Sequence, residues 1–351
     1  MARFPSPSIP RGRARIAAVI ASLLFAGMLT ACGATNEPGA PAGGNSGVTE
    51  PSAFPVTIGH KYGSTTLERA PQRVVTVGLT EQDSLLALGV VPVGVTEFVG
   101  EYPGTVGPWA KDKLGGAPLP TVLKSPEGPS FEQVAALRPD LIIGLYSALT
   151  QEQYDKLSQI APVIAQPDEY ADYGIPWQDT TRTVGKAVGR PAAADGLVQG
   201  VEAKIAQIRK DNPRFEGATA LTATVYEGYF VYGSQDPRTR VLTSLGFKLP
   251  PGLDQIIGDT FGANISMERT DLLDRDALVW LVDDSAGNRA TLANDRLYSG
   301  LKVAKEKREV FIENASDYGN ATTFVTVLSV PYQLDRMVPQ LAAAVDGNPA
   351  T

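Results

Sequence analysis

A regular spacing of apolar residues near the middle of the chain predicts one long helix. Apolar side chains recur every three or four residues between Leu197 and Ile208, which is the spacing of a single helical face. Pro191 stands at the start of this run and Asn212-Pro213 at its end, where proline favours the first turn and the residue before a proline leaves the α region. A helix of about 20 residues is roughly 30 Å long. We expect residues 191–212 to join two lobes.

Short apolar runs alternate with amphipathic stretches before this helix. A hairpin is predicted at residues 56–58 and 65–67, where β-branched residues flank Gly63-Ser64. Strands that alternate with helices indicate a parallel sheet covered on both faces. The predicted strands are 73–77, 90–96, 140–143 and 162–164, and the predicted helices are 81–88, 130–138, 154–160 and 177–188.

The same alternation returns after the helix. The predicted strands are 221–226, 277–282 and 309–312, and the predicted helices are 239–245, one opening at Ser266, 297–304 and 325–344. The two halves also share a motif, because Ser130-x-Glu132 reappears as Ser266-x-Glu268 ahead of a strand. We therefore predict an α/β protein with two Rossmann-like lobes, residues 55–190 and 213–351, and a ligand cleft between them.

The N-terminus reads as a targeting segment rather than as part of the fold. Several arginines precede an apolar run at residues 16–28, which is short for a membrane span and typical of a secretory signal. Leu29-Thr-Ala-Cys32 resembles a bacterial lipobox, in which the cysteine is lipidated and becomes the mature N-terminus; the alternative is an uncleaved anchor. We expect residues 1–31 to be a signal peptide and residues 32–54 to be a lipid-anchored flexible linker.

Composition and charge narrow the function classes. The chain has 351 residues, 43% hydrophobic and 20% charged, and a formal net charge of −7, which becomes more negative when the basic signal segment is removed. An acidic surface argues against nucleic acid as a partner. Cys32 and His60 are the single cysteine and histidine, which excludes an internal disulfide and a Cys/His zinc site, and no Gly-x-Ser-x-Gly motif is present.

The order of motifs along the chain resembles the solute-binding proteins of bacterial iron-siderophore and cobalamin ABC importers, including actinobacterial members. The matching pieces include Pro71-Gln-Arg73-Val-Val75, Leu85-Leu-Ala-Leu-Gly89-Val90, Leu137-x-Pro139-Asp140-Leu-Ile142, Tyr154-Asp-Lys-Leu157-x2-Ile160-Ala-Pro162 and Leu245-Gly246-Phe247. The resemblance covers residues 54 to 345. It implies two α/β lobes bridged by one long helix, a ferric siderophore held between them, and delivery to an ABC permease with its ATPase.

The resemblance also implies a non-enzymatic, extracytoplasmic lipoprotein anchored in the cell membrane, with no cofactor and no bound metal ion of its own. We expect a monomer. A haem or corrinoid ligand on the same fold stays open, as do a secreted hydrolase and a signalling lipoprotein. The first-lobe loops hold few basic residues, unlike those of many catecholate binders, which leaves the siderophore class open.

Ligand-contacting residues are expected in loops after strands, on the edges that face the cleft. Arginine forks bind anionic oxygens in bidentate fashion, and aromatic side chains supply rigid walls. In the family an arginine before the Leu-Gly pair points to the iron centre, so Arg238 or Arg240 is favoured over a simple surface cation, which the helix dipole would disfavour. The candidate ligand contacts are Tyr146, Arg238, Arg240, Tyr232, Trp109, Arg289 and Tyr318, and each of them could instead be a packing or loop residue.

Glu132 and Glu268 occupy equivalent places in the two lobes. In the family, one glutamate on each lobe docks onto arginines of the permease, and these positions match that motif. The alternative is a carboxylate that stabilises a helix N-terminus. Both roles are compatible, and we expect docking.

Overall fold

A computed structural model of the chain describes residues 49–97, 102–124 and 128–347, and all of them belong to one compact unit. The predicted signal peptide, the lipobox cysteine Cys32 and most of the predicted linker lie outside the described residues. No helix in the described ranges is long and apolar enough to cross a membrane.

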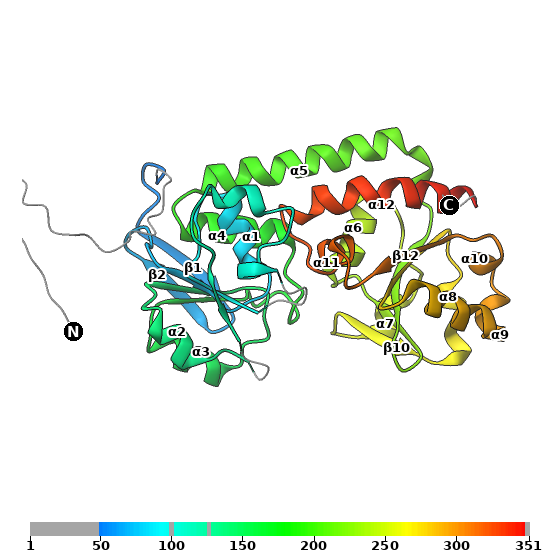
Figure 1. The fold of residues 1–351 in the computed structure, drawn as a ribbon, viewed down its shortest axis with the longest axis horizontal. Helices are drawn as coiled ribbons and strands as arrows, with labels where there is room; N and C mark the ends of the chain where they lie inside the picture. Colours follow the sequence, from blue (N-terminus) through cyan, green and yellow to red (C-terminus); the bar gives the residue numbers. More distant parts are fainter. Residues whose placement is uncertain (1–48, 98–101, 125–127, 348–351) are drawn as a thin grey trace, which may run out of the picture. The chain divides into compact units, whose positions relative to one another are not determined.

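The N-terminal lobe is built on a parallel sheet, as predicted. Its five strands follow the order β5-β4-β3-β6-β7, and a separate hairpin, β1-β2, packs beside it (Figure 1). The strands are β1 (Val56–His60), β2 (Gly63–Leu67), β3 (Val74–Thr76), β4 (Gly94–Thr96), β5 (Thr121–Leu123), β6 (Leu141–Gly144) and β7 (Val163–Ala165). The helices are α1 (Glu81–Ala87), η1 (Pro103–Thr105), η2 (Lys111–Leu114), α2 (Phe131–Ala136), α3 (Gln151–Ser158) and α4 (Trp177–Ala187).

This sheet is buried on both faces, which explains its continuous β-branched and leucine runs. Along β6, Leu141 and Ile143 pack with α1 and α4 on one face, whereas Ile142 packs with α2 and α3 on the other. Figure 1 shows the two pairs of helices on opposite sides of the strands. The alternation of side chains along an extended strand therefore feeds two separate cores.

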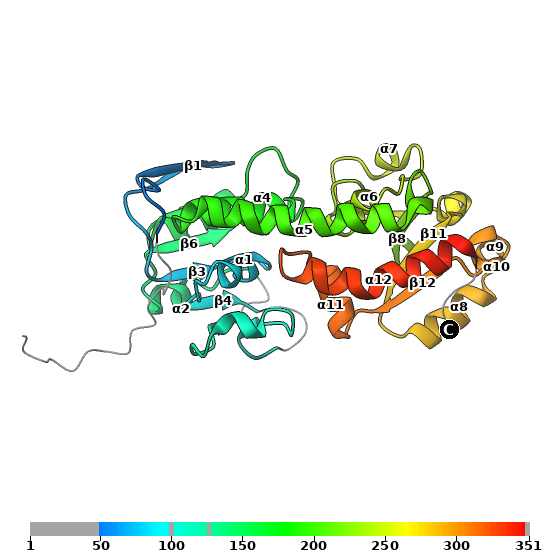
Figure 2. The ribbon, with the colours of Figure 1, turned by 90° about the horizontal axis from the view of Figure 1, so that it is seen from above.

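Helix α5 (Pro191–Asp211) joins the lobes, and its two predicted ends are confirmed within one residue. Its N-terminal turn places Ala194 in the core of the first lobe, whereas Val198 and Val201 pack into the core of the second. Close packing against α4 requires Gly185, because a Cβ at that position would lie 2.3 Å from the Cβ of Ala194. Figure 2 shows α5 alongside α12 above the second lobe.

The C-terminal lobe carries a mixed sheet in the order β10-β9-β8-β11-β12. Strands β8, β11 and β12 are parallel, and β9 and β10 add an antiparallel edge. The strands are β8 (Ala220–Val225), β9 (Tyr229–Tyr232), β10 (Gly262–Ile265), β11 (Ala277–Val282) and β12 (Glu309–Glu313). The helices are η3 (Pro213–Phe215), α6 (Pro237–Ser244), α7 (Leu253–Ile257), η4 (Met267–Leu273), α8 (Ser285–Asn294), α9 (Arg296–Ser299), α10 (Lys302–Lys305), α11 (Asp317–Thr323) and α12 (Ser329–Asp346).

The predicted fold of two α/β lobes joined by a single helix is confirmed. The differences are local. The helix predicted at 297–304 is two short helices separated at Gly300, and the one opening at Ser266 is a 3-10 helix. The predictions missed β5, β9, β10, α7, α8 and α11 and the short 3-10 helices η1, η2 and η3.

Candidate functional site

Tyr146 follows β6 directly and is held by a buried carboxylate from α1. Glu81 Oε1 accepts the backbone N–H groups of Leu145 and Tyr146 at 2.5 and 2.7 Å. Gly78 leaves room for this contact, because a Cβ there would lie 2.0 Å from Glu81 Oε1. Burial raises the pKa of Glu81, and the hydrogen bonds from the backbone oppose that shift. The loop after β6 is thus fixed from inside the lobe, with the Tyr146 side chain 7% exposed.

Arg238 is fixed in the second lobe by an acid two residues before it. Asp236 caps α6 by accepting the Arg238 N–H at 2.8 Å. The same carboxylate accepts Arg238 Nε at 2.8 Å and Nη2 at 2.6 Å, which is a bidentate pair. The guanidinium also lies 4.1 Å from the ring centroid of Tyr232. Burial by itself lowers the pKa of Arg238, but Asp236 outweighs it and the net shift is upward.

Side chains from both lobes meet at this arginine. Burial raises the pKa of Tyr146, and that pKa also responds to the charges of Arg238 and Asp236 on the other lobe. Tyr173, from the loop after β7, packs edge-on against Tyr146 at 5.5 Å between ring centroids. We name this group the tyrosine–arginine cluster, and it consists of Tyr146, Tyr173, Tyr232, Asp236 and Arg238.

The hydroxyl groups of the cluster are available to a ligand. The phenol oxygens of Tyr146, Tyr173 and Tyr232 have no hydrogen-bond partner among the described residues, and the same holds for Arg238 Nη1. Three hydroxyls and one guanidinium nitrogen therefore converge from two lobes. A ligand that offers several oxygen acceptors matches such a donor set.

Arg240 lies beside the cluster and contacts the first lobe. Its guanidinium donates to the carbonyl oxygen of Gly174 and, at 2.9 Å, to Gln235 Oε1. The ring of Tyr170 is 5.9 Å from the Arg240 guanidinium carbon, and burial lowers the pKa of Arg240. A cavity of about 330 Å³ opens next to it, lined by residues of α4, α5 and α6, among them Trp177.

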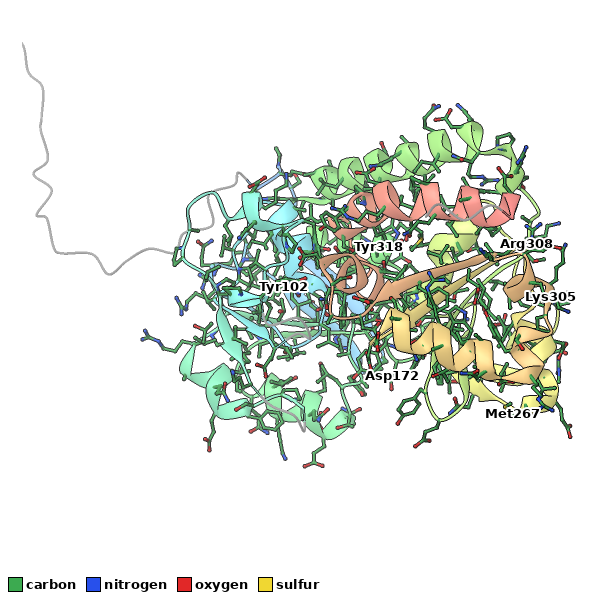
Figure 3. All side chains as sticks on the ribbon, turned by 45° about the vertical axis from the view of Figure 1, so that its right-hand side comes forward. Tyr102, Asp172, Met267, Lys305, Arg308 and Tyr318 are labelled. Atoms are coloured by element: carbon green, nitrogen blue, oxygen red, sulfur yellow. The ribbon has the colours of Figure 1, made fainter. Side chains whose placement is uncertain are left out.

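Trp109 belongs to a second contact between the lobes. Its Nε1 donates to Asp83 Oδ2 at 2.7 Å, and Thr326 Oγ1 of the other lobe donates to the same oxygen at 2.6 Å. The indole packs against Tyr332 at 5.6 Å. Nearby, Tyr102 donates to Asp317 Oδ1 at 2.7 Å, where the lobes meet in Figure 3. We name the group formed by Asp83, Trp109 and Thr326 the Asp83 contact.

Arg289 and Tyr318 are not brought to the tyrosine–arginine cluster. Arg289 stacks on Phe311 at 3.8 Å and lines a cavity of about 560 Å³ that also includes Lys305. Figure 3 places Lys305 at the outer end of the second lobe, far from Tyr102. Tyr318 donates to Gln340 Oε1 at 2.9 Å and packs inside the second lobe.

Glu132 and Glu268 occupy matching exposed positions. Each lies in the first turn of its helix, in α2 and η4, two residues after a serine N-cap that makes no side-chain capping bond. Neither carboxylate has a hydrogen bond or ion pair within the described ranges. Both are therefore free to accept a partner.

The sequence predictions missed the residues that hold the site in place. Asp236 carried a signal, since aspartate directly before a proline is a typical helix N-cap. Tyr173 was possible as a ligand contact from its place in an aromatic loop, but no feature of the sequence placed it among the seven candidates. Glu81 and Asp83 look like ordinary first-turn acids, and their burial depends on segments more than 20 residues away.

Two α/β lobes joined by one helix, with donors from both lobes meeting between them, define a bilobal ligand-binding protein. The chain belongs to the periplasmic binding protein family, whose model matches residues 74–315. Among solved structures, a periplasmic solute-binding protein of Mycobacterium smegmatis is 34% identical, with a TM-score of 0.72 over 83% of this chain and 98% of that one.

Two further relatives carry named ligands. The Streptococcus pneumoniae protein PiaA, solved with ferrichrome, is 27% identical, with a TM-score of 0.74 over 83% of this chain and 99% of that one. The Fe(3+) dicitrate-binding periplasmic protein of Escherichia coli is 29% identical over 208 residues, 57% of this chain and 64% of that protein. The family assignment predicted from the order of motifs is confirmed.

Proposed function

We propose that this protein is the extracytoplasmic binding component of an ABC importer, that it binds a ferric siderophore between its lobes, and that it catalyses no reaction. The observation that carries the proposal is the tyrosine–arginine cluster, in which three hydroxyls and one guanidinium nitrogen converge from both lobes. Relatives that bind ferrichrome and ferric dicitrate support it. Delivery to a permease and its ATPase is part of the proposal.

The donor set suits a chelate whose iron is already fully coordinated. Such a ligand presents oxygen atoms on its surface, and each tyrosine hydroxyl or arginine N–H can donate to one of them. The aromatic faces of Tyr146, Tyr173 and Tyr232 supply apolar contact area around those oxygens. Binding would thus need no protein ligand to the iron itself.

Titration of the purified protein with ferric chelates tests this function. Trp177 packs in the same buried core as Tyr232, so a bound ferric chelate should quench tryptophan fluorescence. We expect Tyr146→Phe to weaken binding by about fivefold, since one hydrogen bond is worth on the order of 1 kcal/mol. Tyr318→Phe is the matched control and should leave affinity unchanged. Quenching by haem or a corrinoid but by no ferric chelate would contradict the proposal.

We also propose that the mature protein is anchored to the membrane through a lipid on Cys32. The support is the lipobox-like Leu29-Thr-Ala-Cys32 and a following segment poor in bulky apolar residues. We expect Cys32→Ala to move the protein from the membrane fraction to the soluble fraction of the producing cells. Immunoblotting of both fractions measures the change, and a variant that stays in the membrane fraction argues for an uncleaved anchor instead.

A further inference from the structure

The cation at the centre of the site is already neutralised by the protein. Asp236 is 1% exposed and engages Arg238 through Nε and Nη2, so one edge of the guanidinium is occupied before any ligand arrives. The same carboxylate caps α6 through the Arg238 N–H, which fixes its position independently of the side chain of Arg238. Asp236 is therefore held in a fixed position within the site.

The guanidinium of Arg240 also has acceptors within the protein. Nη1 donates to the Gly174 carbonyl oxygen and Nη2 donates to Gln235 Oε1. Asp236 lies near enough to influence the pKa of Arg240 as well as that of Arg238. Asp236 thus pairs with Arg238, whereas both terminal nitrogens of Arg240 already donate to neutral oxygens of the protein.

Other acids lie next to Arg240 and after two strands of the second lobe. Asp317 follows β12 and accepts a hydrogen bond from Tyr102 at 2.7 Å. Asp179 accepts one from Tyr170 at 2.5 Å, next to Arg240. A pair of aspartates, Asp283 and Asp284, directly follows β11, and both are exposed. The carboxyl ends of the second-lobe strands therefore present acids rather than bases.

We propose that Asp236 determines ligand specificity by restricting the site to ferric chelates of zero or positive net charge. This inference rests on the proposed function and deepens it. Iron(III) held by three hydroxamates has no net charge, whereas iron(III) held by three catecholates carries three negative charges. The chemical class that fits is thus a ferric trishydroxamate.

Desolvation explains the selectivity. A triply negative chelate loses its hydration on entering the site and needs unpaired cations in exchange, but both arginines already have acceptors. A neutral chelate needs only individual donors for its carbonyl oxygens. Arg238 Nη1 and the hydroxyls of Tyr146, Tyr173 and Tyr232 can provide them.

A panel of ferric chelates tests the proposal, with tryptophan quenching as the readout. Ferrichrome represents the neutral trishydroxamates, ferrioxamine B the trishydroxamates with a positive tail, and ferric enterobactin the triply negative triscatecholates. The wild-type protein should bind the two hydroxamates at least tenfold more tightly than the catecholate. This comparison needs no variant, so it holds even where a substitution impairs folding.

The variant Asp236→Asn then tests whether Asp236 causes the selectivity. Asparagine can still cap α6, but it leaves Arg238 with an unpaired charge, so affinity for the catecholate should rise and the hydroxamate preference should fall by at least tenfold. Asp276→Asn is the matched control, because it removes the same charge from the same lobe at the opposite edge of the sheet, where Asp276 accepts hydrogen bonds from Thr219. The control should keep the wild-type preference.

The results of these titrations distinguish a failure of the charge-selectivity proposal from a failure of the proposed function. A wild-type protein that binds the catecholate as tightly as the hydroxamates overturns the inference and leaves siderophore binding intact. A folded Asp236→Asn protein, verified by its thermal unfolding, that keeps the full hydroxamate preference also overturns it. If no chelate in the panel binds the wild-type protein, the proposed function itself fails.

Discussion

Asp83 is a buried acid that holds Trp109 and the second lobe at the same time. Its side chain receives one hydrogen bond from the indole N–H of Trp109 and one from the hydroxyl of Thr326. Burial raises the pKa of Asp83 to about 6, and those two hydrogen bonds only partly oppose the shift. The contact between the lobes therefore contains a group that changes its charge in mildly acidic solution.

The stability of the protein should depend on pH through this residue. Because the folded pKa of Asp83 lies above the usual value of 3.8, its protonation favours the folded state. The stability that protonated Asp83 contributes is fully present below about pH 4 and is lost as the pH rises through about 6. Asp83→Asn removes this pH-dependent contribution. The free energy of unfolding of the variant should therefore rise by on the order of 2–3 kcal/mol relative to that of wild type between pH 4 and pH 7.

Urea unfolding of both proteins at the two pH values measures this difference. The difference in unfolding free energy between variant and wild type is compared at the two pH values. Other titrating groups affect both proteins equally and therefore cancel. Two stability curves that stay parallel across this range would show that Asp83 keeps an ordinary pKa. The prediction concerns stability alone and holds with or without ligand.

At the residue scale, the sequence identified several side chains that meet and missed the acids that orient them. Tyr146, Arg238 and Tyr232 could be named because they lie near strand ends or a helix start in recognisable motifs. Asp236 was not named because an N-cap signal does not reveal its pairing with Arg238, and Glu81 was not named because it looks in the sequence like any first-turn acid. As ligand contacts, the named residues stay predictions.

At the element scale, α5 begins with a cap supplied from far along the chain. Glu50 accepts the backbone N–H groups of Ala192 and Ala193, each at 2.9 Å, and its own N–H donates to the Gly189 carbonyl oxygen at 2.8 Å. Phe54 packs with the first-lobe core. Residues 49–54, which the sequence assigned to the linker, are thus in contact with the start of α5.

Removing this cap should weaken the interlobe helix. A carboxylate at a helix N-terminus satisfies N–H groups that have no intrahelical partner and interacts favourably with the helix dipole. Glu50→Ala should therefore lower the free energy of unfolding by about 1 kcal/mol. Thermal unfolding measures the change, with the exposed Glu68→Ala as a control. An equal loss in both variants would mean that the cap adds nothing.

The sequence predicted long periodic elements well and short ones poorly. α5 has a sustained apolar spacing between two prolines, so both of its ends were recognisable. β9 and β10 are four residues each, and their strand character comes from pairing with each other and with β8. Such an edge depends on tertiary contacts, which a local pattern does not contain.

At the scale of the whole molecule, each lobe presents an exposed glutamate in the first turn of a helix. Glu132 is the second residue of α2 in the first lobe, and Glu268 is the second residue of η4 in the second. An exposed apolar side chain adjoins Glu268, since Met267 is 48% exposed. A carboxylate beside apolar area is suited to a cationic partner surface.

The double variant Glu132→Ala/Glu268→Ala should separate ligand binding from delivery. Its affinity for the ferric chelate should equal that of wild type, because neither residue touches the tyrosine–arginine cluster. Its support of uptake should fall by at least about tenfold, since removing one partner of an interfacial charge pair costs several kcal/mol. Cellular uptake of radioactive iron presented as the chelate measures delivery.

The matched control is Glu68→Ala/Asp259→Ala, which removes one exposed acid from each lobe without touching either helix start. Because both double variants have the same net charge, a loss of uptake shared by the two would reflect overall charge rather than docking. Normal uptake by Glu132→Ala/Glu268→Ala would restrict the two glutamates to stabilising their helix N-termini. A loss confined to that variant would mean that both lobes engage the permease through equivalent positions, which is the arrangement that the repeated motif predicts.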